Sequence, residues 1–203
     1  ECKRTLYSAG YHIYTSIDPD VQKQLQSSVD NALSGYTEKD KNGIYKTQAS
    51  GTCIDNDTGK VVAIVGGREQ KNIGYTLNRA FQSPRQPGSA IKPLLVYAPA
   101  LEHGWSAGST VNDSPMSTKD KNRVRNSHGS YSGQISLRRA VQKSSNVATM
   151  RIYEQLTPKT CLKYLEEMNF KYLTDSDYKY YTTCIGGFTK GTTSEEMAAG
   201  YAT

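Results

Sequence analysis

The sequence predicts a mixed fold of helices and strands, in the α/β (α+β) class. Two short runs, Ala49–Ile54 and Lys60–Val65, flank the turn-forming stretch Asp55–Gly59, a pattern typical of a β-hairpin. Elsewhere apolar residues recur at the spacing of a helix, and the chain contains no internal repeat. The 203 residues are enough for one large domain or two small ones.

The N-terminal part predicts a strand followed by a helix. Residues Gly10–Ser16 alternate in the manner of a strand. Asp18 is suited to cap a helix whose first position is Pro19, where the missing N–H costs little. Apolar residues then recur at helical spacing until Gly35, which we expect to close this helix.

A longer helix is predicted from Ser89 to Glu102 or His103, with Pro93 near its first turn and Pro99 deeper, where it should kink the helix. The stretch Gly104–Gly133 is rich in glycine and turn residues and predicts loops. Further helical patterns follow, namely one from Ile135 to Tyr153 that is interrupted near Ser144, one from Pro158 and one from Ser194.

The composition is ordinary for a globular protein, with 36% hydrophobic and 22% charged residues. The net charge is +6 and the pI is about 9.0, but the basic residues are scattered. No nucleic-acid-binding motif accompanies them, so no nucleic-acid partner is expected. No run of about 18 apolar residues is present, so we expect any membrane anchor to lie outside this segment.

The four cysteines predict no metal site. They show no Cys-x-x-Cys spacing, and the three histidines are far apart in the sequence. We therefore expect no metal and no cofactor. A disulfide between Cys161 and Cys184 is left open, because sequence alone does not fix pairing, and Cys53 is expected to be a buried small apolar residue of a strand.

The eight residues Gln86–Pro93 carry the clearest functional signal. Ser89 and Lys92 lie three apart, directly after a Pro-Gly turn and at the start of an apolar run. Residues three apart share one face of a helix, so an amine would lie beside a hydroxyl, and a neutral lysine could make the serine a nucleophile. A second Ser-x-x-Lys, at Ser176 and Lys179, lies in a polar stretch and is interpreted as structural.

The only Ser-x-Asn of the chain is Ser144-Ser145-Asn146, which lies between two helical patterns. The Ser144 hydroxyl could relay a proton, and the Asn146 amide could bind a peptide carbonyl and hold the lysine. Alternatively, Ser144 caps the helix that follows.

Ser-x-x-Lys followed by Ser-x-Asn is the motif order of penicillin-binding proteins and class A β-lactamases. The chain resembles the transpeptidase domain of class A (bifunctional) penicillin-binding proteins along nearly its whole length. Four further stretches resemble that domain, namely Tyr11–Gln22, Val61–Gly67, Asn78–Pro93, and Gly186-Gly187 followed by Thr192–Ala199.

The third motif of that family, Lys-Ser/Thr-Gly, is not found. Lys190-Gly191-Thr192-Thr193 has a similar composition but precedes the helical pattern at Ser194, so Lys190 is interpreted as a loop residue. The chain is therefore expected to end before the third motif and to be impaired on its own, with half of the oxyanion hole and some sheet strands missing. An exposed sheet edge would then favour association with another chain.

The resemblance implies an antiparallel sheet flanked by helices next to a helical lobe, a β-lactamase/transpeptidase-like fold that is C-terminally incomplete. Residues 1–48 would be the linker and the strand and helix that lead into the transpeptidase domain, and 49–203 the N-terminal part of that domain. The glycosyltransferase domain of such proteins would precede residue 1.

The resemblance also implies a function. Ser89 would attack the D-alanyl-D-alanine end of a peptidoglycan stem peptide, Lys92 would be the base, Ser144 would shuttle a proton and Asn146 would bind the donor peptide. β-Lactams would acylate Ser89, and the protein would act on the extracytoplasmic face of the bacterial membrane. Two alternatives are a serine D,D-carboxypeptidase or β-lactamase-like hydrolase on the same fold, and a catalytically inactive binding module.

Overall fold

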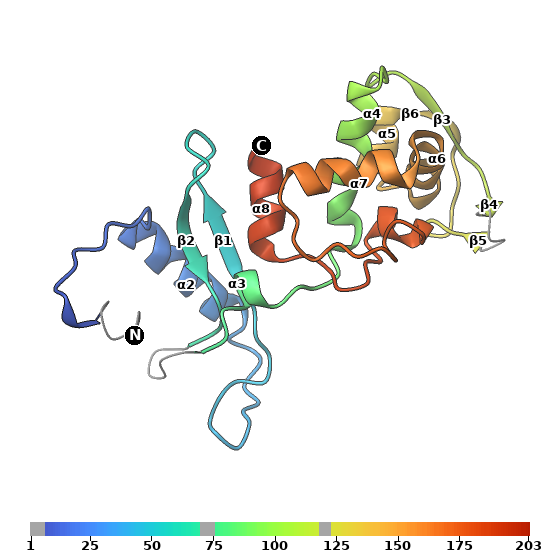
Figure 1. The fold of residues 1–203 in the computed structure, drawn as a ribbon. Coiled ribbons are helices and arrows are strands. Elements are labelled where there is room, and N and C mark those ends of the chain that lie inside the picture. Colours follow the sequence, from blue (N-terminus) through green and yellow to red (C-terminus); the bar gives the residue numbers. More distant parts are fainter. Residues whose placement is uncertain (1–6, 70–75, 118–122) are drawn as a thin grey trace.

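A β-hairpin with its covering helices and a helical lobe make up the structure, a computed structural model that describes residues 7–69, 76–117 and 123–203 (Figure 1). The elements in chain order are α2 (Pro19–Ala32), β1 (Gly51–Ile54), β2 (Val61–Val65), α3 (Arg79–Gln82), η1 (Gly88–Ile91), η2 (Pro93–Tyr97), α4 (Ala98–Glu102), β3 (Thr110–Asp113), β4 (Met116–Ser117), β5 (Arg123–Val124), β6 (Gly133–Ser136), α5 (Leu137–Gln142), α6 (Asn146–Leu156), α7 (Pro158–Glu167), η3 (Tyr181–Ile185) and α8 (Ser194–Ala202).

The predicted hairpin is confirmed. β1 and β2 pair in antiparallel fashion, with Gly51 opposite Val65 and a bulge between Cys53 and Ile54. The Asp55 side chain accepts a hydrogen bond from the Thr58 hydroxyl at 2.6 Å and so closes the turn. Helices α2 and α8 lie on opposite sides of this two-stranded sheet (Figure 1), as expected for a sheet flanked by helices.

Helix α2 begins as its sequence predicts. Asp18 accepts hydrogen bonds from the backbone N–H groups of Asp20 and Val21 at 2.9 and 3.1 Å, and Pro19 occupies the first helical position. The Gln22 side chain accepts from Ile64 N–H at 2.8 Å and donates to the Ile64 carbonyl at 3.0 Å. The amide thereby satisfies backbone groups on the outer edge of β2, as a neighbouring strand would.

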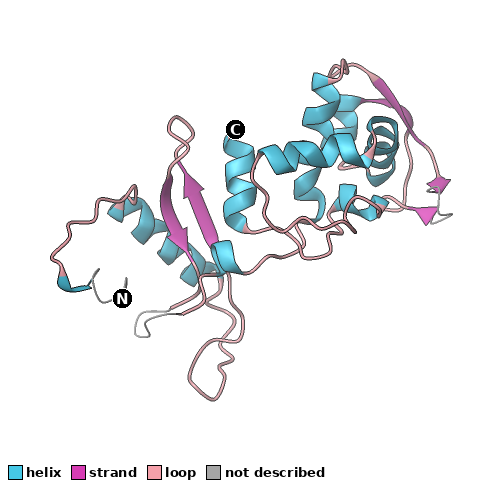
Figure 2. Cartoon of the chain, viewed as in Figure 1, coloured by secondary structure: helices cyan, strands magenta, loops and turns pink. Residues whose placement is uncertain are grey.

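The hydrophobic core lies in the helical lobe, where helices dominate (Figure 2). Leu95 of η2, Ile152 of α6, and Leu162 and Leu165 of α7 are fully buried there. Each such side chain contributes on the order of 1.5–3 kcal/mol by leaving water. This packing fixes η2 against α6 and α7, and so fixes Lys92, the residue directly before η2.

Three predictions about elements need correction. Gly10–Ser16 is irregular and exposed, because no strand of the described residues pairs with it. The stretch 104–133 contains β3, which pairs with β6 at positions too distant for a local pattern to reveal. The segment from Ser89 to His103 is not one α-helix: it passes from a 3₁₀ turn through a π-helical turn into α4.

Cys161 and Cys184 are both free and fully buried, so the disulfide left open by the sequence does not form. Cys53 lies in β1 as predicted but is only half-buried, and Cys2 lies outside the described residues. None of the helices in the described parts of the chain is long and apolar enough to cross a membrane.

Candidate active site

The segment that leads into the Ser89 turn is hydrogen-bonded to the segment between η3 and α8. Arg85 and Thr192 exchange two backbone hydrogen bonds of 2.8 Å. The Gln86 side chain accepts from the Phe188 backbone N–H at 2.7 Å and donates to the Phe188 carbonyl. The chain therefore enters η1 along a fixed path, although nothing in the local sequence of Gln86 signals this role.

Two glycines allow this close approach. Gly88 has φ +56° and Gly186 has φ +95°, both in the left-handed region. A Cβ on Gly186 would lie 2.3 Å from the Gly88 Cα and carbonyl oxygen. Gly186 is thus explained by contact between two backbones, which places η3 directly against the start of η1.

Ser89 lies in η1 and is exposed. Lys92, the residue that follows the end of η1, is only 1% exposed. In a 3₁₀ helix side chains three positions apart are eclipsed, which aligns the two residues more closely than an α-helix would. The Lys92 backbone N–H donates to the Ser89 carbonyl. Within the described residues no hydrogen bond joins the Ser89 hydroxyl to the Lys92 amine.

The Lys92 amine makes three hydrogen bonds with the Ser-x-Asn turn. Nζ donates to the Ser144 carbonyl at 2.7 Å, to the Ser144 Oγ at 3.1 Å and to the Asn146 Oδ1 at 2.7 Å. Burial lowers the pKa of Lys92 from 10.5 to about 8, with the nearby Cys184 acting in the opposite direction. The three acceptors are neutral oxygens, so none of them offsets this lowering as a carboxylate would.

Ser144 adopts φ +49°, a left-handed conformation that few residues other than glycine take up. It follows α5 and precedes the N-cap of α6, so the chain reverses sharply at this position. The reversal brings both the carbonyl and the hydroxyl of Ser144 to Nζ of Lys92. The Asn146 Nδ2 donates to the Arg125 carbonyl at 2.9 Å, which leaves Oδ1 facing the lysine.

The structure therefore joins Lys92, Ser144 and Asn146 by direct hydrogen bonds and holds Ser89 exposed on the adjoining turn. The alternative in which Ser144 caps α6 is wrong: Ser145 is the N-cap, and its hydroxyl accepts from Ala148 N–H at 2.9 Å. Sequence reasoning missed the buried side chains behind this turn, because they lie in a stretch that predicts loops.

The two stretches that merely resemble the motifs are not part of the site. Ser176 and Lys179 form a turn in which the Lys179 backbone N–H donates to the Ser176 carbonyl, and the Lys179 residue is exposed. Lys190 is exposed in the loop before α8, as its context predicts. No group of three or more histidine, cysteine or acidic residues able to hold a metal occurs within the described ranges.

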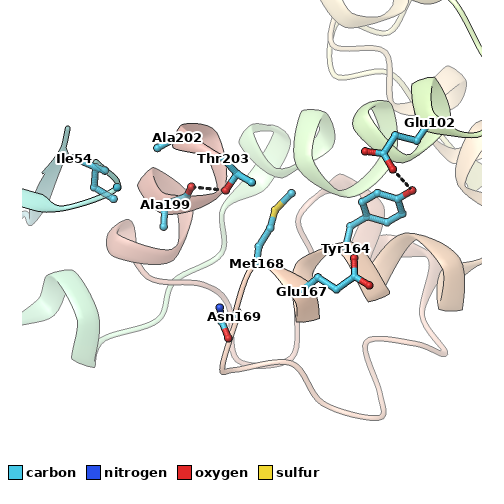
Figure 3. A pocket seen from close by; sticks show the side chains of 10 residues that line it. Ile54, Glu102, Tyr164, Glu167, Met168, Asn169, Ala199, Ala202 and Thr203 are labelled. Atoms are coloured by element: carbon cyan, nitrogen blue, oxygen red, sulfur yellow. Dashed lines mark hydrogen bonds between the residues drawn. The ribbon is translucent and has the colours of Figure 1, made fainter. Parts of the chain in front are cut away.

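A separate cavity of about 510 Å³ opens where α4, α7 and α8 end (Figure 3). Tyr164 and Glu102 line it, and the tyrosine hydroxyl donates to the carboxylate at 2.8 Å. None of the four predicted site residues lines this cavity, so it is distinct from the Ser89 region.

Comparison with known proteins agrees with the fold and the motif order. The family described as penicillin binding protein transpeptidase domain matches residues 49–201. The chain belongs to this family, and the resemblance inferred from its motifs is confirmed. Because the match includes both motifs and the chain's relatives are penicillin-binding proteins, the hydrolase and inert-module alternatives are not favoured.

Several relatives can be named. Penicillin-binding protein 1A of Clostridium perfringens is 37% identical over 182 residues, which are 83% of this chain and 26% of that protein. Penicillin-binding protein 4 of Bacillus subtilis is 34% identical over 200 residues, 98% of this chain and 30% of that protein. The chain thus spans less than a third of the length of these relatives.

A solved structure supports the fold. PonA1 of Mycobacterium tuberculosis, in complex with penicillin V, superposes with a TM-score of 0.80 over 98% of this chain and 52% of that chain, at 23% identity. At this identity the comparison establishes the fold: helices flanking an antiparallel sheet beside a helical lobe, as the resemblance implied.

Proposed function

We propose that this chain carries the acylation site of a peptidoglycan D,D-transpeptidase, with Ser89 as the nucleophile and Lys92 as its base. One observation carries the proposal: a buried lysine amine with a lowered pKa bonds to the Ser-x-Asn turn, and this lysine lies one 3₁₀ turn after an exposed serine. A general base must be partly neutral at working pH, and burial without an anionic partner favours that state.

The hydrogen bonds of Lys92 support proton transfer. A neutral amine has two N–H donors and one lone pair, whereas three oxygens surround Nζ. The two contacts of 2.7 Å go to oxygens that only accept. The longer one, of 3.1 Å, goes to the Ser144 hydroxyl, which can also donate. Ser144 can therefore exchange a proton with the amine while the other two contacts persist.

The reaction follows from these groups. Ser89 Oγ attacks the carbonyl carbon of the penultimate D-alanine, and its proton moves to Lys92. The C–N bond then breaks, Ser144 passes its proton to the departing amine and takes one from the Lys92 ammonium, and the last D-alanine leaves. An acceptor amine attacks the resulting ester, forms the cross-linking amide and restores the Ser89 hydroxyl.

Two further features support substrate binding. The first N–H groups of a helix lack intrahelical partners, so the Ser89 N–H can donate to the oxyanion that develops on the attacked carbonyl. The Asn146 carboxamide lies beside Lys92 and can orient the donor peptide. β-Lactams would occupy the same place and acylate Ser89. Because peptidoglycan lies outside the cytoplasm, the protein is proposed to act on the extracytoplasmic face of the membrane.

The test is covalent labelling with a fluorescent penicillin, followed on a denaturing gel. The purified protein should acquire one label, Ser89→Ala should acquire none, and Ser176→Ala should match the parent. Absence of label from the parent, or label that persists in Ser89→Ala, would refute the assignment of the nucleophile.

A further inference from the structure

Two buried polar side chains lie behind the Ser144–Asn146 turn. Asp113 ends β3 and is 1% exposed, and Asn126 follows β5 and is 3% exposed. The Asn126 Nδ2 donates to the Asp113 Oδ1 at 2.8 Å and to the Ser130 carbonyl at 2.9 Å. Burying two such polar side chains is costly unless each polar atom has a hydrogen-bond partner. The groups to which Asp113 and Asn126 bond therefore indicate what the two side chains do.

Asn126 satisfies the start of helix α6. Its Oδ1 accepts from the backbone N–H groups of Asn146 at 2.9 Å and Val147 at 3.2 Å. The next N–H, of Ala148, donates to the Ser145 hydroxyl, and that of Thr149 to the Ser145 carbonyl. All four N–H groups at the start of this helix are therefore bonded.

Asp113 fixes the turn from the side of the sheet. Its Oδ1 accepts from the Ser145 hydroxyl at 2.6 Å, and its Oδ2 from the Ser132 N–H at 3.0 Å. Because Asp113 pairs with Gly133 in the β3–β6 ladder, the carboxylate is attached to a rigid element. Ser145, at the centre of the Ser-x-Asn motif, is thereby bonded to both members of the pair.

The left-handed conformation of Ser144 costs roughly 1–3 kcal/mol and persists only when surrounding contacts impose it. The contacts on its C-terminal side include those that Ser145 and Asn146 make with the buried pair. We infer that Asp113 and Asn126 are positioning residues, which hold the Ser144–Asn146 turn so that its hydroxyl and carboxamide face Lys92. This inference rests on the proposed function, since it assigns the pair a task in acylation.

A swap of the two side chains tests the inference. In Asp113→Asn the new N–H₂ group must face a donor, either the Asn126 Nδ2 or the Ser132 N–H. In Asn126→Asp two carboxylates face each other, so each single variant should shift the turn. A displacement of about 1 Å can cost about a hundredfold in rate, and we expect the penicillin acylation rate to fall at least about tenfold in each. The double variant restores one donor and one acceptor between the two side chains but leaves the Ser130 carbonyl without its donor, so it should recover part of the lost rate.

Glu196→Gln is the matched control. Glu196 is a buried carboxylate of α8 that accepts from the N–H groups of Lys171 and Thr193, and these partners lie outside the Ser144–Asn146 turn. Its variant should lose thermal stability but keep the parent's acylation rate per folded molecule. If the single variants fail to fold, the acylation rate of the double variant is compared with that of the parent instead.

Each outcome has one meaning. Single variants that acylate at the parent rate, a double variant no faster than the singles, or an equal loss in Glu196→Gln would overturn the positioning role while leaving Ser89 as the nucleophile. Label that persists in Ser89→Ala would instead refute the proposed function, and the inference with it.

Discussion

Lys92 is the residue on which the proposed chemistry depends. It is among the largest fully buried side chains of the described chain, and its three acceptors are neutral oxygens. A carboxylate partner would favour the ammonium and return the pKa toward its ordinary value. The site instead keeps the lysine in a protein interior that penalises its charge, which is the condition that the proposed role as a base requires.

The pH dependence of acylation should follow Lys92. Because its pKa is lowered to about 8, the amine is mostly protonated below that pH. The second-order rate constant for penicillin acylation should therefore rise about tenfold per pH unit below about pH 8 and level off above it. Stopped-flow fluorescence between about pH 6 and about pH 9.5 measures this. A flat profile across that range would exclude Lys92 as the base.

The same shift has a consequence for stability. Lowering the pKa from 10.5 to about 8 corresponds to a penalty of about 3 kcal/mol for holding the ammonium in the folded state. Below about pH 8 both states are protonated and the full penalty applies. Between about pH 8 and 10.5 the unfolded state binds more protons, so the penalty is relieved as pH rises.

Lys92→Met should remove this dependence. As pH rises from about 7.5 to about 10, the parent should gain stability relative to Lys92→Met. The gain in unfolding free energy should approach the penalty of about 3 kcal/mol for the buried ammonium. Urea titrations at fixed pH values measure the difference. A pH-independent difference would show that the folded lysine titrates normally.

At the scale of single residues, the sequence indicated the residues of the proposed site but not the buried side chains that hold them. Ser89 with Lys92, and Ser144 with Asn146, were recognisable because three- and two-residue spacings place groups together locally. Asp113 and Asn126 were not, because they reach the turn from positions 32 and 19 residues away from Ser145 along the chain. No periodic pattern encodes such long-range contacts.

Among the elements, the two glycine-containing turns determine where Ser89 lies. Gly186→Ala should displace η1, because the new Cβ would lie 2.3 Å from Gly88 and φ +95° disfavours alanine. We expect a loss of about 1–3 kcal/mol in stability and a penicillin acylation rate at least about tenfold lower.

Gly59→Ala is the control that separates the cost of a left-handed φ from the cost of a clash with Gly88. Gly59 has φ +68°, but an alanine Cβ at this position would meet no atom within 4 Å, so only the strain cost applies. This variant should lose about 1 kcal/mol, since alanine tolerates a left-handed φ poorly, and should acylate at the parent rate. Equal acylation rates for the two variants would show that the Gly88–Gly186 contact does not position the nucleophile.

Element prediction succeeded where signals were local. The hairpin, α2, α7 and α8 carry their own turns, caps and apolar spacing. It failed for β3 and β6, whose pairing joins distant segments, and for Gly10–Ser16, whose alternation has no neighbouring strand among the described residues. The prolines at 93 and 99 explain why the helix after Ser89 is not uniform, because each removes one backbone N–H donor.

For the whole molecule, the two edges of the hairpin differ. α2 satisfies backbone groups on the outer edge of β2, whereas β1 has no strand on its other side among the described residues. An open edge is a template for pairing with another chain. We expect the chain to associate as its concentration rises, with a mass by light scattering above 22.4 kDa. A constant mass of 22.4 kDa over a wide dilution series would contradict this.

The overall architecture was predictable chiefly from the order of the motifs. Periodicity indicated a hairpin and helices, but the flanking of the sheet by α2 and α8 followed only from resemblance to the transpeptidase family. The proposed assignment of residues 1–48 to a leading segment and 49–203 to the transpeptidase domain likewise rests on that resemblance.

The central claim is that Ser89 forms a covalent bond when the site acts. Peptide mapping by mass spectrometry after incubation with penicillin V tests it most directly. We predict a single penicilloyl adduct on the peptide that contains Ser89, formed in the parent and not in Lys92→Ala. An adduct on Ser144 or Ser176, or one that forms equally fast without Lys92, would contradict the claim.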